Sequence, residues 1–353
     1  MLFEDFSGLR LFGVIVGLAL VFASIWWGRR RSPGSSSPLP LLLMGALLFI
    51  VGLFPTIARA PADLLFIGDV DGGALIFLLV LSTIVSWLLL LWMRSRIEHV
   101  RQRSNALLHS VAVNGFMQAN ENAAEGDRKV FVVIPALNEE DTLPAVLADI
   151  PSEVCGHPVN IMVVDDGSTD KTGQLSKEAG AFVLRMPINS GQGSALKAGY
   201  KACTSLGAEV VATLDADGQN VARELESVVK PVLDHEADVV IGSRLLGDFE
   251  KTNISRTVGV HFFNFILSTI TGAKITDCAS SFRAFSAEMI DKVRLEQEQY
   301  QSAEVLVEAA KNNFRIAEVP ISWRRRQSGA TRKAATAKYG FFFARTILKT
   351  WLR

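Results

Sequence analysis

Three long apolar stretches crowd the first hundred residues of this 353-residue chain. They cover residues 9–27, 39–58 and 74–93, and none of them contains an acidic residue. Each has about the 20 residues that a helix needs to cross the hydrocarbon core of a bilayer. We therefore predict three transmembrane helices. A cleaved signal peptide is the alternative for the first stretch, but its arginines follow the apolar residues and no small-residue cleavage site is evident.

The basic residues beside these stretches predict their orientation. Residues 28–38 hold three arginines and no acid, and residues 94–103 hold four arginines against one glutamate. Basic flanks stay in the cytoplasm. We therefore expect a multi-pass protein of the cytoplasmic (inner) membrane, with its N-terminus outside and everything after residue 94 inside.

The composition changes after the third apolar stretch. Apolar residues at helical spacing continue to about residue 115, so residues 1–115 are expected to form a membrane domain with a juxtamembrane helix. Residues 116–128 are polar and unpatterned, as in a linker. Over residues 129–335, helical patterns separate short apolar runs at 130–135, 161–166, 182–186, 209–215 and 238–243. This alternation predicts a mostly parallel α/β sheet, in which ligands bind at the carboxyl ends of the strands.

Polar residues gather at four of those strand ends: Pro135, Asn138 and Glu139; Asp165 and Asp166; Asp215, Asp217 and Gln219; and Gly242, Ser243 and Arg244. An acid after a strand is often only a turn residue or a helix cap. Four strand ends of the same character favour a binding site instead.

Asp215 and Asp217 are two residues apart on an extended segment, so both carboxylates point to one side. A hard divalent ion, Mg²⁺ or Mn²⁺, would relieve their repulsion and still leave room for substrate phosphates, and Gln219 could add an oxygen. A solvated turn is the alternative. Gly191 stands at a predicted helix entrance, where small residues allow close approach of a phosphate, although plain helix-start geometry explains it equally well. The three cysteines and five histidines show no metal-ligand spacing.

Six motifs follow one another in order: "VVIPALNEEDTL", "VVDDGSTDKT", "NSGQGSALKAGY", "LDADGQN", "IGSR" and "TDCASSFRAF". As a set they resemble glycosyltransferase family 2, whose catalytic domain has the Rossmann-like GT-A fold. The later "EVPISWRRRQSGATR" resembles the end of the polyprenyl-phosphate branch of that family, which includes the dolichol-phosphate mannose synthases. The resemblance covers about residues 129–335. Residues 1–115 resemble a three-span membrane domain sometimes found beside such enzymes.

The resemblance implies roles for particular residues. The nucleotide sugar would be bound by Pro135, Asn138, Glu139, Gly191, Asp215 and either Asp165 or Asp166, one of which reads the base. The metal would be bound by Asp215, Asp217 and Gln219. The acceptor phosphate would be bound by Ser281, Arg283 and Arg326, and the catalytic residues would be Asp217, Arg244 and Arg283. Ser281 stands where the family usually has glycine, and Thr331-Arg332 stands where it often has Ser-Lys.

The type of acceptor can be argued from charge. A hydroxyl acceptor needs a general base, whereas a phosphate monoester, with a second pKa near ~6, is already largely dianionic and needs cations to hold it. The later half of the domain offers arginines, at 244, 256, 283 and 324–326, and lacks the Glu-Asp pair and the Gln-x-x-Arg-Trp motif of hydroxyl-directed relatives. Asp277 is either a base or a residue that orients the following turn.

Two further segments, 258–272 and 338–353, are apolar but too short or too charged to span a bilayer. Both are predicted to lie in the membrane interface, although the first could equally be a core helix. Residues 336–353 are expected to form a basic amphipathic helix, since the chain after Glu318 has nine Lys and Arg and no acid.

These arguments predict a metal-dependent, inverting enzyme that moves a hexose from a nucleotide sugar to a polyprenyl phosphate, undecaprenyl or dolichyl. A downstream membrane glycosyltransferase or flippase is a possible partner, and no nucleic acid is expected. The nearest alternative is a family 2 enzyme that acts on a hydroxyl of a glycolipid or envelope polysaccharide. A non-catalytic scaffold that only binds nucleotide sugars is the alternative from another class.

Overall fold

The structure, a computed structural model, describes residues 8–29, 39–54, 73–120, 129–247, 254–297, 301–324 and 336–353. The chain divides into two compact units, Met1–Gln102 and Arg103–Arg353, which are described separately. Arg326, predicted to bind the acceptor phosphate, lies outside the described residues.

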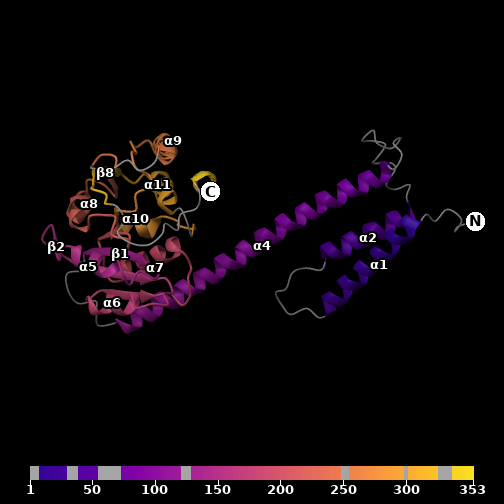
Figure 1. The fold of residues 1–353 in the computed structure, drawn as a ribbon, viewed down its shortest axis with the longest axis horizontal. Helices are drawn as coiled ribbons and strands as arrows, with labels where there is room; N and C mark the ends of the chain where they lie inside the picture. Colours follow the sequence, from indigo (N-terminus) through magenta and orange to yellow (C-terminus); the bar gives the residue numbers. More distant parts are fainter. Residues whose placement is uncertain are drawn as a thin grey trace, which may run out of the picture. The chain divides into compact units, whose positions relative to one another are not determined.

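The first unit contains helices α1 (Gly8–Arg29) and α2 (Leu39–Leu53) and the beginning of α4 (Gly73–Ala119). α1 and α2 lie side by side (Figure 1) and approach closely at two glycines. A Cβ atom on Gly17 would lie 2.8 Å from the carbonyl oxygen of Gly45, so neither position has room for a side chain. Over the described residues, no helix is both long and apolar enough to cross a bilayer, so the structure does not support the three predicted transmembrane helices.

The last turns of α4 belong to the second unit. Ala112, Val113 and Phe116 are buried there, and the Phe116 ring meets the edge of Phe182 with 6.2 Å between ring centroids. The segment that was expected to start a linker at residue 116 is therefore helical up to Ala119 and part of the hydrophobic core of this unit.

An eight-stranded sheet forms the centre of the second unit. Its strands are β1 (Val130–Ala136), β2 (Glu153–Val154), β3 (His157–Asp165), β4 (Phe182–Arg185), β5 (Val210–Thr213), β6 (Val239–Ser243), β7 (Arg283–Ser286) and β8 (Ile316–Pro320). The order is β2-β3-β1-β5-β7-β6-β8, with β4 also paired to β3. β7 runs antiparallel between β5 and β6, and β2 runs antiparallel to β3, whereas the other six strands run in one direction. The sheet is therefore mixed but mostly parallel, as the sequence predicted.

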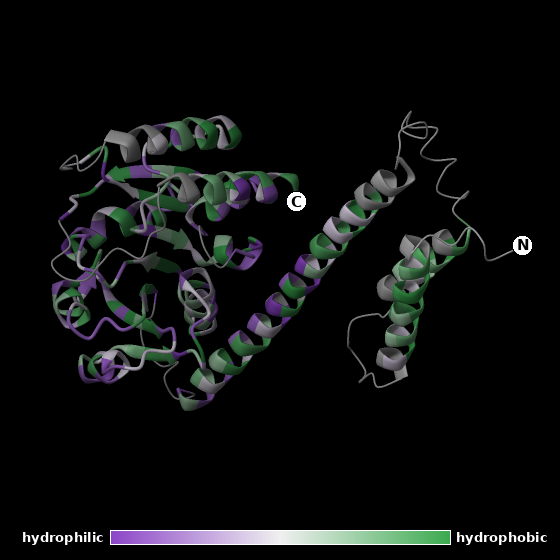
Figure 2. Ribbon diagram, turned by 45° about the vertical axis from the view of Figure 1, so that its right-hand side comes forward, coloured by the Kyte–Doolittle hydropathy of each residue, from purple (hydrophilic) through white to green (hydrophobic). Residues whose placement is uncertain are grey.

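Helices cover both faces of this sheet because side chains alternate along the buried strands. Phe131 and Val133 belong to one apolar cluster, and Val132 and Ile134 to the other. Figure 2 shows hydrophobic residues along the central strands and polar residues in the loops around them. The helices are α5 (Leu143–Asp149), α6 (Thr172–Glu178), α7 (Gln192–Ser205), α8 (Leu225–Leu233), α9 (Ile254–Thr271), α10 (Ala287–Lys292), α11 (Gln301–Lys311) and α12 (Thr336–Leu352).

Candidate active site

The predicted site residues gather because three parallel strands end at one edge of the sheet. β1 lies between β3 and β5, and Ala136 at the end of β1 pairs with Asp165 at the end of β3. The backbone N–H of Asp166 donates to the carbonyl of Ala136 over 2.9 Å. Pro135 lies half-buried within β1. Three of the four strand ends that the sequence singled out, those of β1, β3 and β5, are therefore neighbours in space, whereas β7 lies between β5 and β6.

The loop after β1 is tied to the loop after β3. The N–H of Asn138 donates to Ser168 Oγ (3.0 Å), and the side-chain oxygen of Asn138 accepts from the N–H of Thr169 (2.8 Å). The next N–H, from Glu139, donates to Thr172 Oγ1 (2.9 Å). Asn138 takes a φ of 51°, a left-handed conformation that asparagine tolerates better than most residues. Asn138 and Glu139 thus shape the wall of the site, and their contact with a nucleotide stays a prediction.

The two aspartates after β3 have different partners. Asp165 is fully buried, and its Oδ1 accepts from the N–H of Ser168 (2.7 Å). Asp166 accepts from the N–H groups of Ser190 and Gly191, each over 2.8 Å. Burial raises the pKa of the Asp166 carboxyl, and these two hydrogen bonds oppose the rise. Asp166 thereby holds the glycine loop at the entrance of α7, where Gly191 has a φ of 89° that favours glycine.

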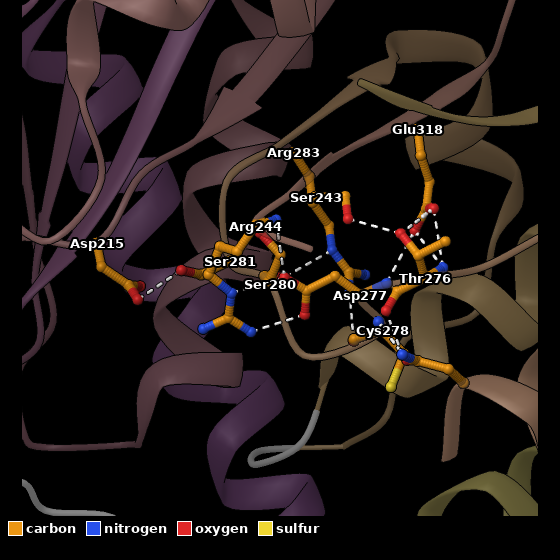
Figure 3. A network of polar contacts seen from close by, with 11 residues as sticks. Asp215, Ser243, Arg244, Thr276, Asp277, Cys278, Ser280, Ser281, Arg283 and Glu318 are labelled. Atoms are coloured by element: carbon orange, nitrogen blue, oxygen red, sulfur yellow. Dashed lines mark hydrogen bonds and ion pairs between the residues drawn. The ribbon is translucent and has the colours of Figure 1, made fainter. Parts of the chain in front are cut away.

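Asp215 joins three parts of the chain at the end of β5. Its Oδ1 accepts from Gln192 Nε2 at the start of α7 (3.0 Å), and its Oδ2 accepts from Ser281 Oγ (2.6 Å; Figure 3). Ser281 is held in turn, since its carbonyl accepts from Thr213 Oγ1 (2.6 Å). Gln192 was not singled out from the sequence, although it directly follows Gly191 in the glycine-rich motif.

Asp217 and Gln219 form a tight turn after Asp215. The N–H of Gln219 donates to Asp217 Oδ1 (3.1 Å), and Gly218 between them has a φ of 70°. The carbonyl of Gln219 accepts from the N–H of Arg324 (2.8 Å). In the part of the chain that the structure describes, no three His, Cys, Asp or Glu side chains cluster as metal ligands. A cation here would therefore rest on the two aspartates, a glutamine and the substrate's own oxygens.

Arg244 and Asp277 form a buried ion pair. The guanidinium donates to both carboxylate oxygens, from Nε (2.6 Å) and from one terminal nitrogen (2.7 Å), and the N–H of Arg244 adds a third bond (3.1 Å). Asp277 is fully buried, and the guanidinium carbon of Arg244 lies 4.6 Å from the centroid of the Trp323 ring. Of the two roles open to Asp277, orientation therefore fits better than that of a base.

Arg283 is held beneath the turn that carries Ser281. It is 2% exposed, and its guanidinium donates to the carbonyls of Cys278 (2.7 Å), Ser280 (2.9 Å) and Ser302 (2.7 Å). Burial lowers the pKa of this guanidinium. The predicted contact of Arg283 with a phosphate stays a prediction. The structure gives it another role, because these bonds join the turn to the first turn of α11.

Comparison of the chain with solved structures shows its fold. A glucosyl-3-phosphoglycerate synthase from Mycobacterium tuberculosis, crystallised with Mn²⁺, UDP and its product, superposes with a TM-score of 0.51 over 65% of this chain and 81% of the synthase. The two sequences are 21% identical, so the likeness concerns the fold. The mixed sheet, with acidic residues at its strand ends, therefore has a GT-A-like α/β fold.

The sequence comparisons then identify the family. Residues 131–294 match the model of Glycosyl transferase family 2. A UDP-N-acetylglucosamine–dolichyl-phosphate N-acetylglucosaminyltransferase of Methanococcus voltae is 31% identical over 218 residues, 55% of this chain and 85% of the relative. A polyprenol monophosphomannose synthase of Mycolicibacterium smegmatis is 29% identical over 221 residues, 59% of this chain and 82% of the relative. The chain belongs to glycosyl transferase family 2 and is a glycosyltransferase, as the motifs predicted.

Proposed function

We propose that this enzyme transfers a hexose, with inversion, from a nucleotide diphosphate sugar to a polyprenyl phosphate at the cytoplasmic face of a membrane. The observation that carries the proposal is the Arg244–Asp277 pair. The carboxylate that a hydroxyl acceptor could have used as a base is buried against a guanidinium. The charged group at this position is then the Arg244 guanidinium, which is firmly held and suits an acceptor phosphate that is already ionised. The names of the two relatives agree with this acceptor.

On the donor side, Asp215 and Asp217 would hold a Mg²⁺ or Mn²⁺ ion, with Gln219 as a further oxygen ligand. These residues fit such an ion because two carboxylates and an amide oxygen are hard oxygen ligands of the kind that it prefers, and two of the donors to Asp215, Gln192 and Ser281, are neutral groups. Mg²⁺ is commonly bound by one or two carboxylates together with substrate phosphates. When bound, such an ion would stabilise the charge that develops on the departing nucleoside diphosphate.

The transfer itself needs no proton to be removed from the acceptor. An oxygen of the acceptor phosphate forms a bond to the anomeric carbon while the bond from that carbon to the donor diphosphate breaks on the opposite side. Arg244 would orient the acceptor dianion for this attack, because a planar guanidinium can donate two parallel hydrogen bonds to phosphate oxygens. Glu139 and Asn138, with the loop that Asp166 holds, would keep the nucleotide in place.

Two helices of the second unit support a lipid acceptor. α9 buries Asn264 and Leu267 but exposes Phe262 and Phe265, which are 57% and 72% exposed. α12 buries Phe343 and Ile347 and exposes Phe341 and Trp351. The two helices touch through Phe263 and Phe343, whose ring centroids are 4.9 Å apart. We propose that these amphipathic helices lie on the membrane surface, where aromatic side chains are favoured.

The proposal is tested by incubating the purified protein with UDP- and GDP-sugars and a short-chain polyprenyl phosphate, with mass spectrometry of the lipid product. We expect a singly glycosylated lipid phosphate whose formation stops when EDTA removes divalent ions and resumes with Mg²⁺ or Mn²⁺. The sugar should be released by mild acid, because a glycosyl phosphate is labile there.

Other outcomes would contradict the proposal in distinct ways. Transfer to the hydroxyl of an added glycolipid, giving a sugar that resists mild acid, with no transfer to polyprenyl phosphate, would indicate a hydroxyl acceptor. Activity that persists in EDTA would refute the metal assignment at Asp215 and Asp217. Binding of nucleotide sugars without any turnover of donor would contradict the acceptor and the mechanism together.

A further inference from the structure

Glu318 is a carboxylate to which neither the motifs nor the comparisons give a role. It lies on β8, where it pairs in register with Ile241 of β6. Its two oxygens accept from the N–H of Thr276 (2.8 Å to each) and from Thr276 Oγ1 (2.6 Å), and Oε1 also accepts from the N–H of Asp277 (3.0 Å). Figure 3 shows these bonds converging on the Glu318 carboxylate. All these donors are neutral and belong to two consecutive residues.

Thr276 and Asp277 lie in a segment whose backbone N–H groups are not paired within a helix or a sheet. α9 ends at Thr271 and β7 begins at Arg283, and the segment between them is irregular. Buried N–H groups outside helices and sheets must be satisfied by other acceptors. Glu318 supplies that acceptor for both residues at once. Thr276 is fixed a second time, because its hydroxyl lies 2.6 Å from Ser243 Oγ on β6.

The two residues that bond to Glu318 include the hydrogen-bond partner of Arg244. The residue whose N–H bonds to Glu318 is Asp277, and the Asp277 carboxylate receives three bonds from Arg244. A contiguous series of hydrogen bonds therefore runs from β8 through the backbone of Asp277 to the guanidinium. Within a buried network of this kind, moving one member moves the others.

We propose that Glu318 is a positioning residue for sugar transfer, which fixes the guanidinium of Arg244 by holding Thr276 and Asp277. A glutamate suits the task because both of its oxygens accept hydrogen bonds. Glutamine would keep one acceptor and turn an NH₂ group toward the donors of Thr276 and Asp277. A group that orients a reactant must be held closely, since a displacement of about 1 Å can cost about 10²-fold in rate. The inference rests on the proposed role of Arg244 in sugar transfer.

The first test is the Glu318→Gln variant of the full chain. We expect kcat to fall by about 10- to 100-fold while the melting temperature stays close to that of the control variant. The matched control is Asp238→Asn, at the opposite end of the same two strands. Asp238 also accepts from a backbone N–H and a side chain, both of Arg315, over 2.8 Å and 3.0 Å. The Asp238→Asn variant should change kcat by less than about two-fold, because the Asp238 side chain contacts no residue of the candidate active site.

The decisive measurement combines Glu318→Gln with Arg244→Lys. If Glu318 acts through Arg244, the double variant should be no slower than Arg244→Lys alone, since the group to be positioned is already altered. Losses that multiply, or a Glu318→Gln variant with wild-type kcat, would overturn the proposal. Should Glu318→Gln fail to fold, Thr276→Val replaces it in the same cycle, because it removes one bond to Glu318 and keeps the backbone.

The assay follows release of nucleoside diphosphate from UDP-glucose and GDP-mannose, with polyprenyl phosphate and without any acceptor. A crystal structure of Glu318→Gln reports on Arg244 even if polyprenyl phosphate proves to be the wrong acceptor, because it should show the guanidinium displaced from its wild-type position, whereas an unmoved guanidinium would overturn the role of Glu318. A failure of the acceptor proposal is in this way separated from a failure of the role of Glu318.

Discussion

Replacing Asp217 by asparagine is expected to lower the rate of sugar transfer by about 10³-fold or more. The substitution keeps the shape of the side chain and removes one of two charges that would hold the divalent ion. Metal stabilisation of a leaving group is worth several kcal/mol, and each 1.36 kcal/mol is a factor of ten in rate. Transfer of labelled sugar and the affinity for Mn²⁺ should both fall, the second of which can be measured without any substrate.

The control for this substitution is Asp234→Asn. Asp234 is partly exposed and paired with Lys230 on the surface of α8 (2.6 Å), so the exchange has the same chemistry outside the site. It should leave both the transfer rate and Mn²⁺ binding unchanged, since exposed ion pairs contribute little. Full activity in Asp217→Asn would refute the assignment of the metal to this turn.

The parts of the fold that could be predicted are those with a strong local signal. β1, β5 and the second half of β3 (Met162–Asp165) are buried on both faces, so their apolar runs and the polar residues after them could be recognised in the sequence. β7 and β8 were missed. β7 has four residues and begins with the charged Arg283, and β8 is half-buried, carries Glu318 and ends at Pro320. Neither has a hydrophobic period, and their pairing depends on the rest of the sheet.

In the candidate site, too, features set by neighbouring residues could be predicted, whereas contacts between residues far apart in the sequence could not. That Asp215, Asp217 and Gly191 stand at strand and helix ends followed from neighbouring residues. What each charged group contacts did not, because the partners are far apart in the sequence: Arg244 and Asp277 are separated by 33 residues, and Thr276 and Glu318 by 42. A single sequence gives the charge of a side chain but not the group that it pairs with. For that reason the three carbonyls that accept hydrogen bonds from Arg283 could not be predicted, and its contact with a phosphate stays a prediction.

The second large effect is expected from the buried pair itself. Arg244→Met should lower the free energy of unfolding by about 3–5 kcal/mol, because it leaves Asp277 fully buried with no cation. The double variant Arg244→Met, Asp277→Asn should recover much of that loss, since the uncompensated charge is gone. Urea unfolding of the four proteins, wild type and three variants, gives the coupling energy directly.

This cycle also separates the two roles assigned to Arg244, which are to pair with the buried Asp277 and to bind the acceptor phosphate. The double variant should be stable yet remain without transfer activity, because methionine cannot hold a phosphate. The corresponding cycle on the exposed pair Arg315–Asp238 is the control and should show little coupling. If Arg244→Met unfolded at the same urea concentration as the wild type, the Arg244–Asp277 pair would not be a buried ion pair that stabilises the fold. A stable double variant that regained transfer would instead show that the cation is not needed, and with it the argument for a phosphate acceptor would lose its main support.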